Sequence, residues 1–182
     1  MNITIITATY NSAITIQDTL ASIQSQNFPS VEHLIIDGNS QDNTLEVVKS
    51  FNPLLKIISE PDNGLYDAMN KGIRLANGSI IGILNSDDFY PNPNVLSHVA
   101  SCFQQENCDL VYGDLLYVDL ENTHKIIRRW RAKPWKKDKF LFGWMPPHPT
   151  LFVRREVYQE YGLFNTGLRF SADYEFMIRT VL

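Results

Sequence analysis

Short apolar runs alternate with amphipathic segments along the first half of the chain. The apolar runs end in polar turns, as buried strands of a parallel sheet do, and the segments between them space apolar residues like one face of a helix. Strands that alternate with helices form βαβ units, so we expect a mostly parallel sheet with right-handed crossovers. The predicted strands are 3–8, 34–36, 56–59 and 79–84, and the predicted helices are 14–23, 45–51, 65–76 and one from about residue 94.

The rhythm changes after residue 108. Strand-like segments then follow one another across short turns, so we expect a mixed or antiparallel arrangement in this part of the sheet. We treat 1–182 as a single domain with two halves, 1–108 and 109–182. The elements expected in the second half are strands at 110–112, 115–118, 125–130 and 150–153 and helices at 155–161 and 173–182.

The composition fits one globular domain. The 182 residues are 44% hydrophobic and 20% charged, which allows a core but leaves little room for a second domain. Cys102 and Cys108 lie six residues apart and form no CxxC motif, which favours reduced thiols over a disulfide framework or a zinc site. The N-terminus lacks a positive leader and no apolar run approaches the roughly 20 residues of a membrane span, so we expect a cytoplasmic protein.

The charge is polarised along the sequence. Segment 125–139 holds eight of the 16 basic residues and one acid, which gives it a net charge of +7. Because the whole chain has a net charge of −4, the other residues together carry −11. The overall balance argues against nucleic-acid binding. Trp130 and Trp135 interrupt the cations, a mixture that suits an anionic membrane surface or a lipid-phosphate acceptor. A peripheral contact with the inner face of the membrane is therefore one interpretation, and a solvated charged hairpin is the other.

Polar side chains follow all four of the first strands. Ligands of open parallel sheets bind outside the carboxyl ends of the strands. Turn formation and helix capping explain each loop taken singly, but four such loops at one edge favour a binding site. The polar residues are Thr9, Tyr10 and Asn11, then Asp37 and Asn39, then Glu60 and Asp62, and finally Asn85, Asp87 and Asp88.

The adjacent acids Asp87 and Asp88 are the most specific local feature. Two carboxylates 4 Å apart repel by roughly 4 kcal/mol in a medium of effective dielectric about 20. A divalent cation removes this repulsion, and oxygen ligands are those that Mg²⁺ or Mn²⁺ select. Such a cation also stabilises a departing diphosphate. A solvated turn before the helix near Asn94 is the alternative interpretation.

The chain contains six short motifs in a specific order and spacing. They are Thr7–Asn11 (TATYN), Ile36–Thr44 (IDGNSQDNT), Glu60–Gly72 (EPDNGLYDAMNKG), Leu84–Asp88 (LNSDD), Pro147–Arg155 (PHPTLFVRR) and Ala172–Phe176 (ADYEF). With these motifs the chain resembles the family 2 glycosyltransferases of the GT-A fold over essentially its whole length. The resemblance implies an α/β domain with a GT-A-like, Rossmann-type mixed sheet flanked by helices. It also implies sugar transfer from a nucleotide-diphosphate donor to an acceptor hydroxyl with inversion.

The resemblance assigns roles in the donor site. Asp37 matches the acid that hydrogen-bonds the nucleotide base, with an Asp-Gly turn as the alternative. Tyr10 either lies against the base or packs in the core, and Lys71 either reaches a donor phosphate or pairs with Asp67. The implied donor-site residues are Thr9, Tyr10, Asn11, Asp37, Lys71 and Asp87.

The metal motif departs from the family pattern. Asn85 stands at its first acidic position, which removes one charge. Asp87 and Asp88 are expected to supply the ribose contact and the ligand to Mn²⁺ or Mg²⁺, and which carboxylate does which is open.

The second half supplies the expected catalytic base. Asp173 matches the acid of the family's ED-type motif, although Ala172 replaces the acid usually found before it. A carboxylate at a helix start can face the acceptor hydroxyl, while a plain helix N-terminal charge is the alternative. Glu175 is the second choice for the base and a candidate contact for the acceptor or a phosphate. His148, between two prolines, is a candidate contact for the acceptor, a phosphate or the metal, or a structural turn residue.

The sequence thus predicts a metal-dependent, inverting glycosyltransferase with a UDP-type donor. The acceptor is expected to be a glycan or a lipid-linked glycan in surface glycan or polysaccharide synthesis. The chain stops nine residues after Asp173, within a predicted helix, so we expect the acceptor-side half to be truncated at its C-terminus. The alternatives are a truncated or degenerate nucleotide-binding domain without transferase activity and a nucleotidyltransferase, which lacks support because no GxxxxGK[ST] loop occurs.

Overall fold

Strand β1 (Ile3–Thr9) is the buried centre of the molecule. In the computed structural model, which describes residues 1–140 and 142–181, all seven residues of β1 are buried. It pairs in parallel with β2 (Val31–Asp37) on one side and with β4 (Ile80–Ile83) on the other. Parallel pairing of β2 with β3 (Lys56–Ser59) completes the part of the sheet predicted from the apolar runs.

The sheet has six strands in the order β3-β2-β1-β4-β8-β5. After β1 the chain builds β2 and β3 on one side and then returns to place β4 on the other side, which makes a topological switch point between β1 and β4. Strand β8 (Phe152–Arg154) runs antiparallel to β4, and β5 (Leu110–Val111) runs antiparallel to β8. The expected mixed sheet of a single α/β domain is therefore confirmed.

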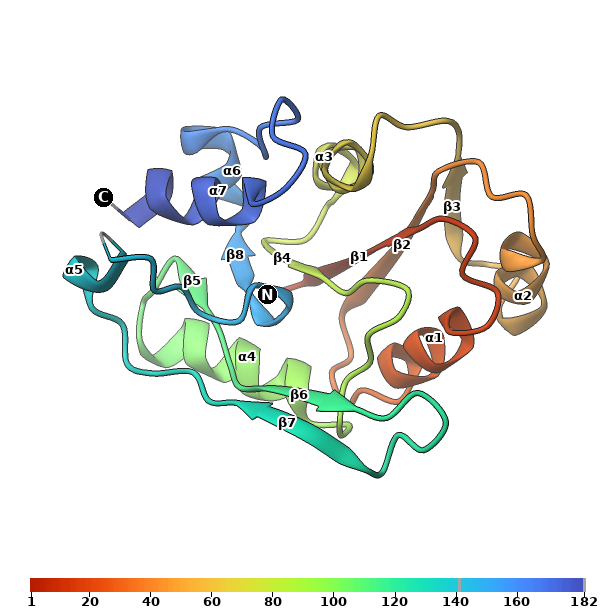
Figure 1. Ribbon diagram of the computed structural model, residues 1–182, viewed down its shortest axis with the longest axis horizontal. Helices are drawn as coiled ribbons and strands as arrows, with labels where there is room; N and C mark the ends of the chain where they lie inside the picture. The colour runs from red at the N-terminus through yellow and green to blue at the C-terminus, as the bar shows by residue number, and fades with distance from the viewer. Residues whose placement is uncertain (141, 182) are drawn as a thin grey trace.

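Helices cover both faces of the sheet (Figure 1). One face packs against α3, α6 and α7 in one apolar cluster, and the other packs against α1, α2 and α4 in two further clusters. Among the described residues no helix is long and apolar enough to cross a membrane. The helices are α1 (Ile16–Gln24), α2 (Thr44–Phe51), α3 (Leu65–Leu75), α4 (Val95–Gln105), α6 (Arg155–Tyr161) and α7 (Ala172–Val181).

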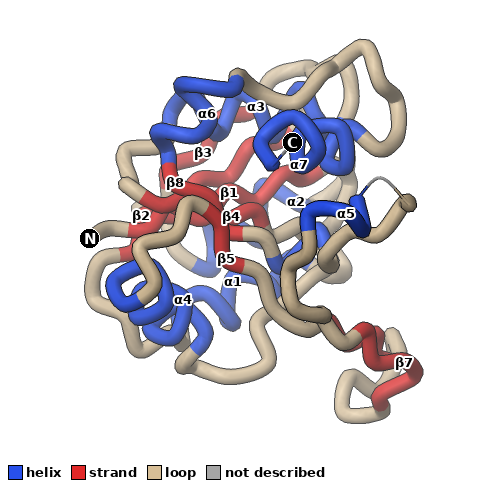
Figure 2. The backbone as a smooth tube through the Cα atoms, turned by 90° about the vertical axis from the view of Figure 1, so that its left-hand side faces the viewer, coloured by secondary structure: helices blue, strands red, loops and turns tan. Residues whose placement is uncertain are grey.

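The basic segment is divided between two structures. Strand β6 (Leu115–Val118) pairs antiparallel with β7 (Ile126–Trp130) in a separate two-stranded ribbon, which projects from the globule in Figure 2. The segment then forms the short helix α5 (Lys137–Phe140), which the sequence did not predict. Phe140 is buried against Trp135 and Trp144, so aromatic packing rather than helical periodicity holds α5 in place.

Several predicted boundaries change in the second half. The strand expected at 150–153 begins only at Phe152, because His148–Thr150 forms a 3₁₀ turn, η1. The Thr150 hydroxyl stabilises this turn by donating to the Pro147 carbonyl at 2.7 Å. The last helix begins at Ala172, and the predicted end at Leu182 lies outside the described residues.

Close packing of α3 on β1 gives a test of the fold. A Cβ at Gly72 would lie 2.4 Å from Cγ2 of Ile6. Gly72→Ala is therefore expected to destabilise the protein by about 1–3 kcal/mol, although alanine is favoured in a helix by about 0.5–1 kcal/mol. Urea unfolding measures the change, with Gly113→Ala as the control because nothing lies within 4 Å of a Cβ there. Equal or greater stability of Gly72→Ala would contradict the close approach.

Candidate active site

Two buried oxygen atoms at the switch point have no hydrogen-bond partner among the described residues. They are Oγ1 of Thr9, the last residue of β1, and Oδ1 of Asn85, just beyond β4. Buried polar groups in folded proteins are nearly always paired, so unpaired ones require an explanation. Their place at the carboxyl ends of β1 and β4 is where a sheet of this topology binds its ligand.

The loop after β1 is tied to the loop after β2 by side chains. Asn11, in the left-handed backbone region with φ of 51°, accepts the Gln41 amide N–H through Oδ1 at 2.8 Å. The main-chain N–H of Asn11 donates to Oγ of Ser40 at 2.9 Å. The Ser12 and Ser86 hydroxyls, 2.8 Å apart, connect the same loop to the one after β4. Asn11 therefore shapes the edge, and its predicted donor contact stays a prediction.

Asp37 is completely buried. Its carboxylate accepts hydrogen bonds from the amide and hydroxyl of Ser40, at 3.1 and 2.5 Å, and from the hydroxyl of Ser59 at 2.7 Å. These bonds join the ends of β2 and β3 and agree with the turn interpretation of Asp37. Its contact with a nucleotide base stays a prediction.

A second acid in this region was not among the predicted donor-site residues. Oδ2 of Asp62 faces Gly38 so closely that a Cβ there would lie 2.5 Å from it and 3.5 Å from the ring of Tyr10. Asp62 is fixed because its Oδ1 accepts the Gly64 amide at 2.9 Å. Tyr10 is 60% exposed, which excludes the core-packing alternative. The only sequence feature that indicated that Asp62 lies near Tyr10 is its position directly after a predicted strand.

Lys71 is held by the loop after β3. Its ammonium lies 3.0 Å from Glu60 and 3.8 Å from Asp67, and donates to the Pro61 carbonyl at 2.8 Å. These contacts match the predicted pairing with Asp67 and add a second acid. The ammonium therefore fixes the loop that carries Asp62, while its predicted phosphate contact stays a prediction.

Asp87 and Asp88 differ in environment. Asp87 is exposed, whereas Asp88 is partly buried, and its main-chain carbonyl accepts the Thr19 hydroxyl at 2.8 Å. Burial, followed by repulsion from Asp87, raises the pKa of Asp88 to about 6. A cation would stabilise the ionised Asp88 carboxylate against both its burial and the repulsion from Asp87. The Asn85 amide oxygen could also bind the cation as a ligand, so these oxygen donors fit Mg²⁺ or Mn²⁺. Residues 1–140 and 142–181 contain no group of three or more His, Cys, Asp or Glu side chains arranged for a metal, so further ligands would come from substrate oxygens and water.

Asp173 meets two side chains from distant parts of the chain. The Tyr66 hydroxyl of α3 donates to its Oδ1 at 2.8 Å, and Nδ1 of His148 lies 3.2 Å from its Oδ2. Burial, followed by the Asp173 carboxylate, raises the pKa of Tyr66, so the phenol stays a donor. The structure thus brings the predicted residues Asp173 and His148 together. The neighbouring Ala172 is fully buried, where an acid would lose its hydration.

Glu175 points into a different arrangement. Its carboxylate oxygens lie 2.8 and 3.0 Å from the guanidinium of Arg179, one turn further along α7. Arg179 in turn donates to the Leu163 carbonyl at 2.8 Å. The carboxylate of Glu175 therefore stabilises α7 through Arg179 and does not join the Asp173 cluster.

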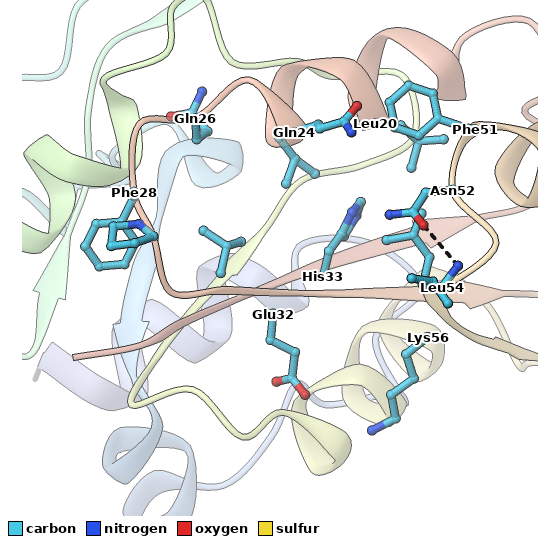
Figure 3. A pocket seen from close by; sticks show the side chains of 14 residues that line it. Leu20, Gln24, Gln26, Phe28, Glu32, His33, Phe51, Asn52, Leu54 and Lys56 are labelled. Carbon is cyan, nitrogen blue, oxygen red and sulfur yellow. Dashed lines mark hydrogen bonds between the residues drawn. The ribbon is translucent and has the colours of Figure 1, made fainter.

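A surface cleft of about 480 Å³ lies away from the predicted site (Figure 3). Glu32 and His33 of β2 line it together with Phe28 and Phe51. Burial lowers the pKa of His33 to about 4, and its Nε2 lies 3.0 Å from the Thr7 hydroxyl, so this ring is neutral. None of the predicted site residues lines this cleft.

The mixed sheet, with its switch point between β1 and β4, has the fold of the GT-A glycosyltransferases. Residues 4–162 match the model of glycosyl transferase family 2, and the chain belongs to this family. A PGL/p-HBAD biosynthesis glycosyltransferase of Mycobacterium tuberculosis is 34% identical over 96% of this chain and 68% of its own.

Solved structures of similar fold contain nucleotides and metal. Staphylococcus aureus TarS 1-349 in complex with UDP has a TM-score of 0.76 at 22% identity, covering 100% of this chain and 55% of that one. The mannosyltransferase PcManGT of Pyrobaculum calidifontis, in complex with GDP-Man and Mn²⁺, has a TM-score of 0.77 at 24% identity, covering 98% and 51%. The chain thus spans about half of the length of these two neighbours.

The raised pKa of Asp88 predicts a pH-dependent stability. A carboxyl whose pKa rises on folding, here from 3.8 to about 6, costs folding stability once it is ionised. Without metal, Asp88→Asn should therefore raise the free energy of unfolding by up to about 3 kcal/mol above pH 6. The gain should disappear as the pH falls from 6 towards 4. Urea unfolding of both proteins across this range measures it, with Glu121→Gln, an exposed carboxyl between β6 and β7, as the control. A gain that persists at pH 4 would contradict the buried charge.

Proposed function

We propose that this chain transfers a sugar, with inversion, from a nucleotide-diphosphate donor to an acceptor hydroxyl. The observation that carries the proposal is the Asp87–Asp88 pair beside two buried oxygens at the β1/β4 switch point, which have no hydrogen-bond partner within residues 1–140 and 142–181. A bound cation would neutralise the repulsion between the two carboxylates. The cation and the diphosphate that it binds would also give the buried oxygens polar partners. Residues 1–108 form the donor half and residues 109–182 the acceptor half.

The donor is of the UDP type. Support comes from the TarS complexes with UDP and UDP-GlcNAc, whereas GDP-Man is the donor bound to PcManGT. In this chain the exposed Tyr10 ring offers the base a face, and Asp37 orders the loop beneath it. Thr9, Asn11 and Lys71 complete the donor site that the family resemblance implies.

Asp87, Asp88 and the amide oxygen of Asn85 would hold Mn²⁺ or Mg²⁺. When bound, the cation supplies positive charge to the diphosphate as the bond to the sugar breaks. Asp173 acts as the general base that removes the proton from the acceptor hydroxyl. The hydrogen bond from the Tyr66 hydroxyl and the contact with His148 orient the carboxylate for this step.

The acceptor is a glycan or lipid-linked glycan in surface glycan or polysaccharide synthesis, met at the inner face of the membrane. The β6–β7 ribbon supports a peripheral contact because it projects with Arg128 and Arg129 beside the exposed side chain of Ile127. The Arg128 guanidinium lies over the rings of Tyr117 and Trp130, at 5.4 and 5.9 Å from their centroids. Cations next to exposed apolar groups suit an anionic lipid surface.

The base assignment predicts a separation of binding from chemistry. Asp173→Asn removes the proton acceptor but keeps an oxygen for the Tyr66 hydroxyl, so UDP release from UDP-sugars should fall by at least about 100-fold. UDP affinity with Mn²⁺, measured by calorimetry, should stay the same. Glu175→Gln, two residues along α7, is the matched control and should retain turnover. Near-normal turnover of Asp173→Asn would remove Asp173 as base, and pyrophosphate release instead of UDP would indicate nucleotidyl transfer.

The ribbon predicts salt-sensitive membrane binding. Removing two exposed cations with Arg129→Ser/Arg131→Ser should weaken sedimentation with phosphatidylserine vesicles by about 10- to 30-fold, since each cation contributes about 1 kcal/mol. The charge-matched control Lys49→Ser/Arg74→Ser, on α2 and α3, should bind as the parent does. Equal losses in the two variants, or binding that does not change with salt, would contradict a contact through the ribbon.

A further inference from the structure

The second part of the basic segment forms a surface, the α5 platform, which consists of residues 133–140 and 142–144. Phe140 is buried at its centre. The ring of Phe140 contacts those of Trp135 and Trp144, with centroids 4.7 and 5.1 Å apart. Aromatic packing therefore gives this short cationic stretch a fixed shape.

Two tyrosine hydroxyls attach the platform to the globule. The Tyr112 hydroxyl, just after β5, donates to the Lys133 carbonyl at 3.0 Å. The Tyr174 hydroxyl donates to the Phe140 carbonyl at 2.7 Å, and the two rings stack with centroids 6.5 Å apart. Tyr174 directly follows Asp173 in α7, and Figure 2 shows α5 beside this helix. The platform thus lies next to the proposed base.

The chain also leads from the platform directly to the turn that contacts Asp173. His148, whose Nδ1 lies 3.2 Å from Oδ2 of Asp173, follows Trp144 by four residues. Four residues span at most about 14 Å, and Pro146 and Pro147 restrict this stretch. A glycan that presents its hydroxyl to Asp173 can therefore extend to the platform.

Lys136 and Lys139 are the cations on which the inference depends. The amide of Lys139 donates to the Lys136 carbonyl at 3.1 Å, so the two residues lie one turn apart, where like charges repel. Of the carboxylates that the structure describes, including that of Asp138 between them, none lies at ion-pair distance from either ammonium group. The Lys139 ammonium lies over the Trp144 ring, 5.7 Å from its centroid. A bound anion would relieve the repulsion between the two lysines.

Exposed apolar side chains accompany these cations. Trp135 is 42% exposed and Phe142 is 87% exposed, although other aromatic rings of the platform are covered. Water alone would serve a site for a small inorganic anion, whereas exposed rings beside cations suit a phosphate that is joined to a hydrocarbon chain. The platform therefore favours a lipid phosphate over a free one.

We propose that Lys136 and Lys139 bind the phosphate of a lipid-linked acceptor while its hydroxyl faces Asp173. This inference rests on the proposed glycosyl transfer and specifies its acceptor. The ammonium groups hold the phosphate through charge-assisted hydrogen bonds, and Trp135 and Phe142 contact the first part of the lipid chain. The basic segment then has two tasks, because the β6–β7 ribbon meets the membrane surface and the α5 platform binds the substrate.

Calorimetry with geranyl phosphate as the probe tests this site. The protein is first saturated with UDP and Mn²⁺, so that the donor site is closed to the probe. Lys136→Gln/Lys139→Gln should weaken binding of geranyl phosphate by about 10- to 30-fold, because two cations beside the phosphate are lost. Lys136→Arg/Lys139→Arg keeps both charges and should bind as the parent does. The charge-matched control Lys49→Gln/Arg74→Gln, on α2 and α3, should also bind as the parent does.

The indole N–H signals of the three tryptophans locate the bound probe by NMR. Geranyl phosphate should shift the signals of Trp135 and Trp144 and leave that of Trp130, in the ribbon, unchanged. A shift confined to Trp130, equal binding of geraniol, or equal affinity of the glutamine variant and the parent would overturn the inference. Equal affinity for inorganic phosphate would overturn the lipid-linked source of the phosphate.

Two further measurements distinguish this inference from its neighbours. If UDP binds with Mn²⁺ but geranyl phosphate does not bind, the acceptor inference fails and the proposed function stands. If UDP does not bind with Mn²⁺, the proposed function fails and the acceptor inference falls with it. If Lys136→Gln/Lys139→Gln loses sedimentation with phosphatidylserine vesicles but keeps geranyl phosphate affinity, the platform is a membrane contact and the inference is overturned.

Discussion

The parallel pairing of β1 with both β2 and β4 is the constraint on which the rest depends. Because the chain continues to opposite sides of β1, the polar ends of β1 and β4 come to one edge without a helix between them. Burial of all of β1 fixes this geometry, and hydrogen bonds of Asp37, Asn11 and Ser12 then hold the loops in place. The edge keeps two oxygen atoms without a hydrogen-bond partner in the described part of the chain, and a carboxylate with a raised pKa. This is a local cost that a bound cation and diphosphate would relieve.

Helix α3 connects this edge to the acceptor side. Tyr66 and Asn70, one turn apart, both reach the second half of the chain. Tyr66 donates to Asp173, and the buried Asn70 amide exchanges two hydrogen bonds with the backbone of Phe164, at 2.8 and 3.0 Å. Gly72 lets the same helix approach β1 closely. The position of the proposed base is therefore coupled to the sheet that binds the donor, although more than 100 residues separate Tyr66 from Asp173 in the sequence.

Local patterns predicted the elements better than they predicted contacts. Strand β3 matches its predicted bounds and most of the helices lie close to theirs, because apolar periodicity reflects burial on the sheet. Helix α5 was missed because Phe140 is buried through contacts with other aromatic side chains rather than through periodicity. The sequence named Asp173 and His148 separately but did not indicate that they touch. It also gave no sign that Ser40 and Ser59 would occupy the carboxylate of Asp37, since both arrangements depend on tertiary packing.

The central claim is that donor and metal bind at the β1/β4 switch point, and paramagnetic broadening of amide NMR signals tests it most directly. Mn²⁺ added with UDP should selectively broaden the signals of residues 9–11 and 85–88, because the ion lies beside them. Diamagnetic Mg²⁺ with UDP should shift these signals without broadening them. Broadening centred on Glu32 and His33, in the separate cleft, or broadening spread evenly over the acidic surface would contradict the account.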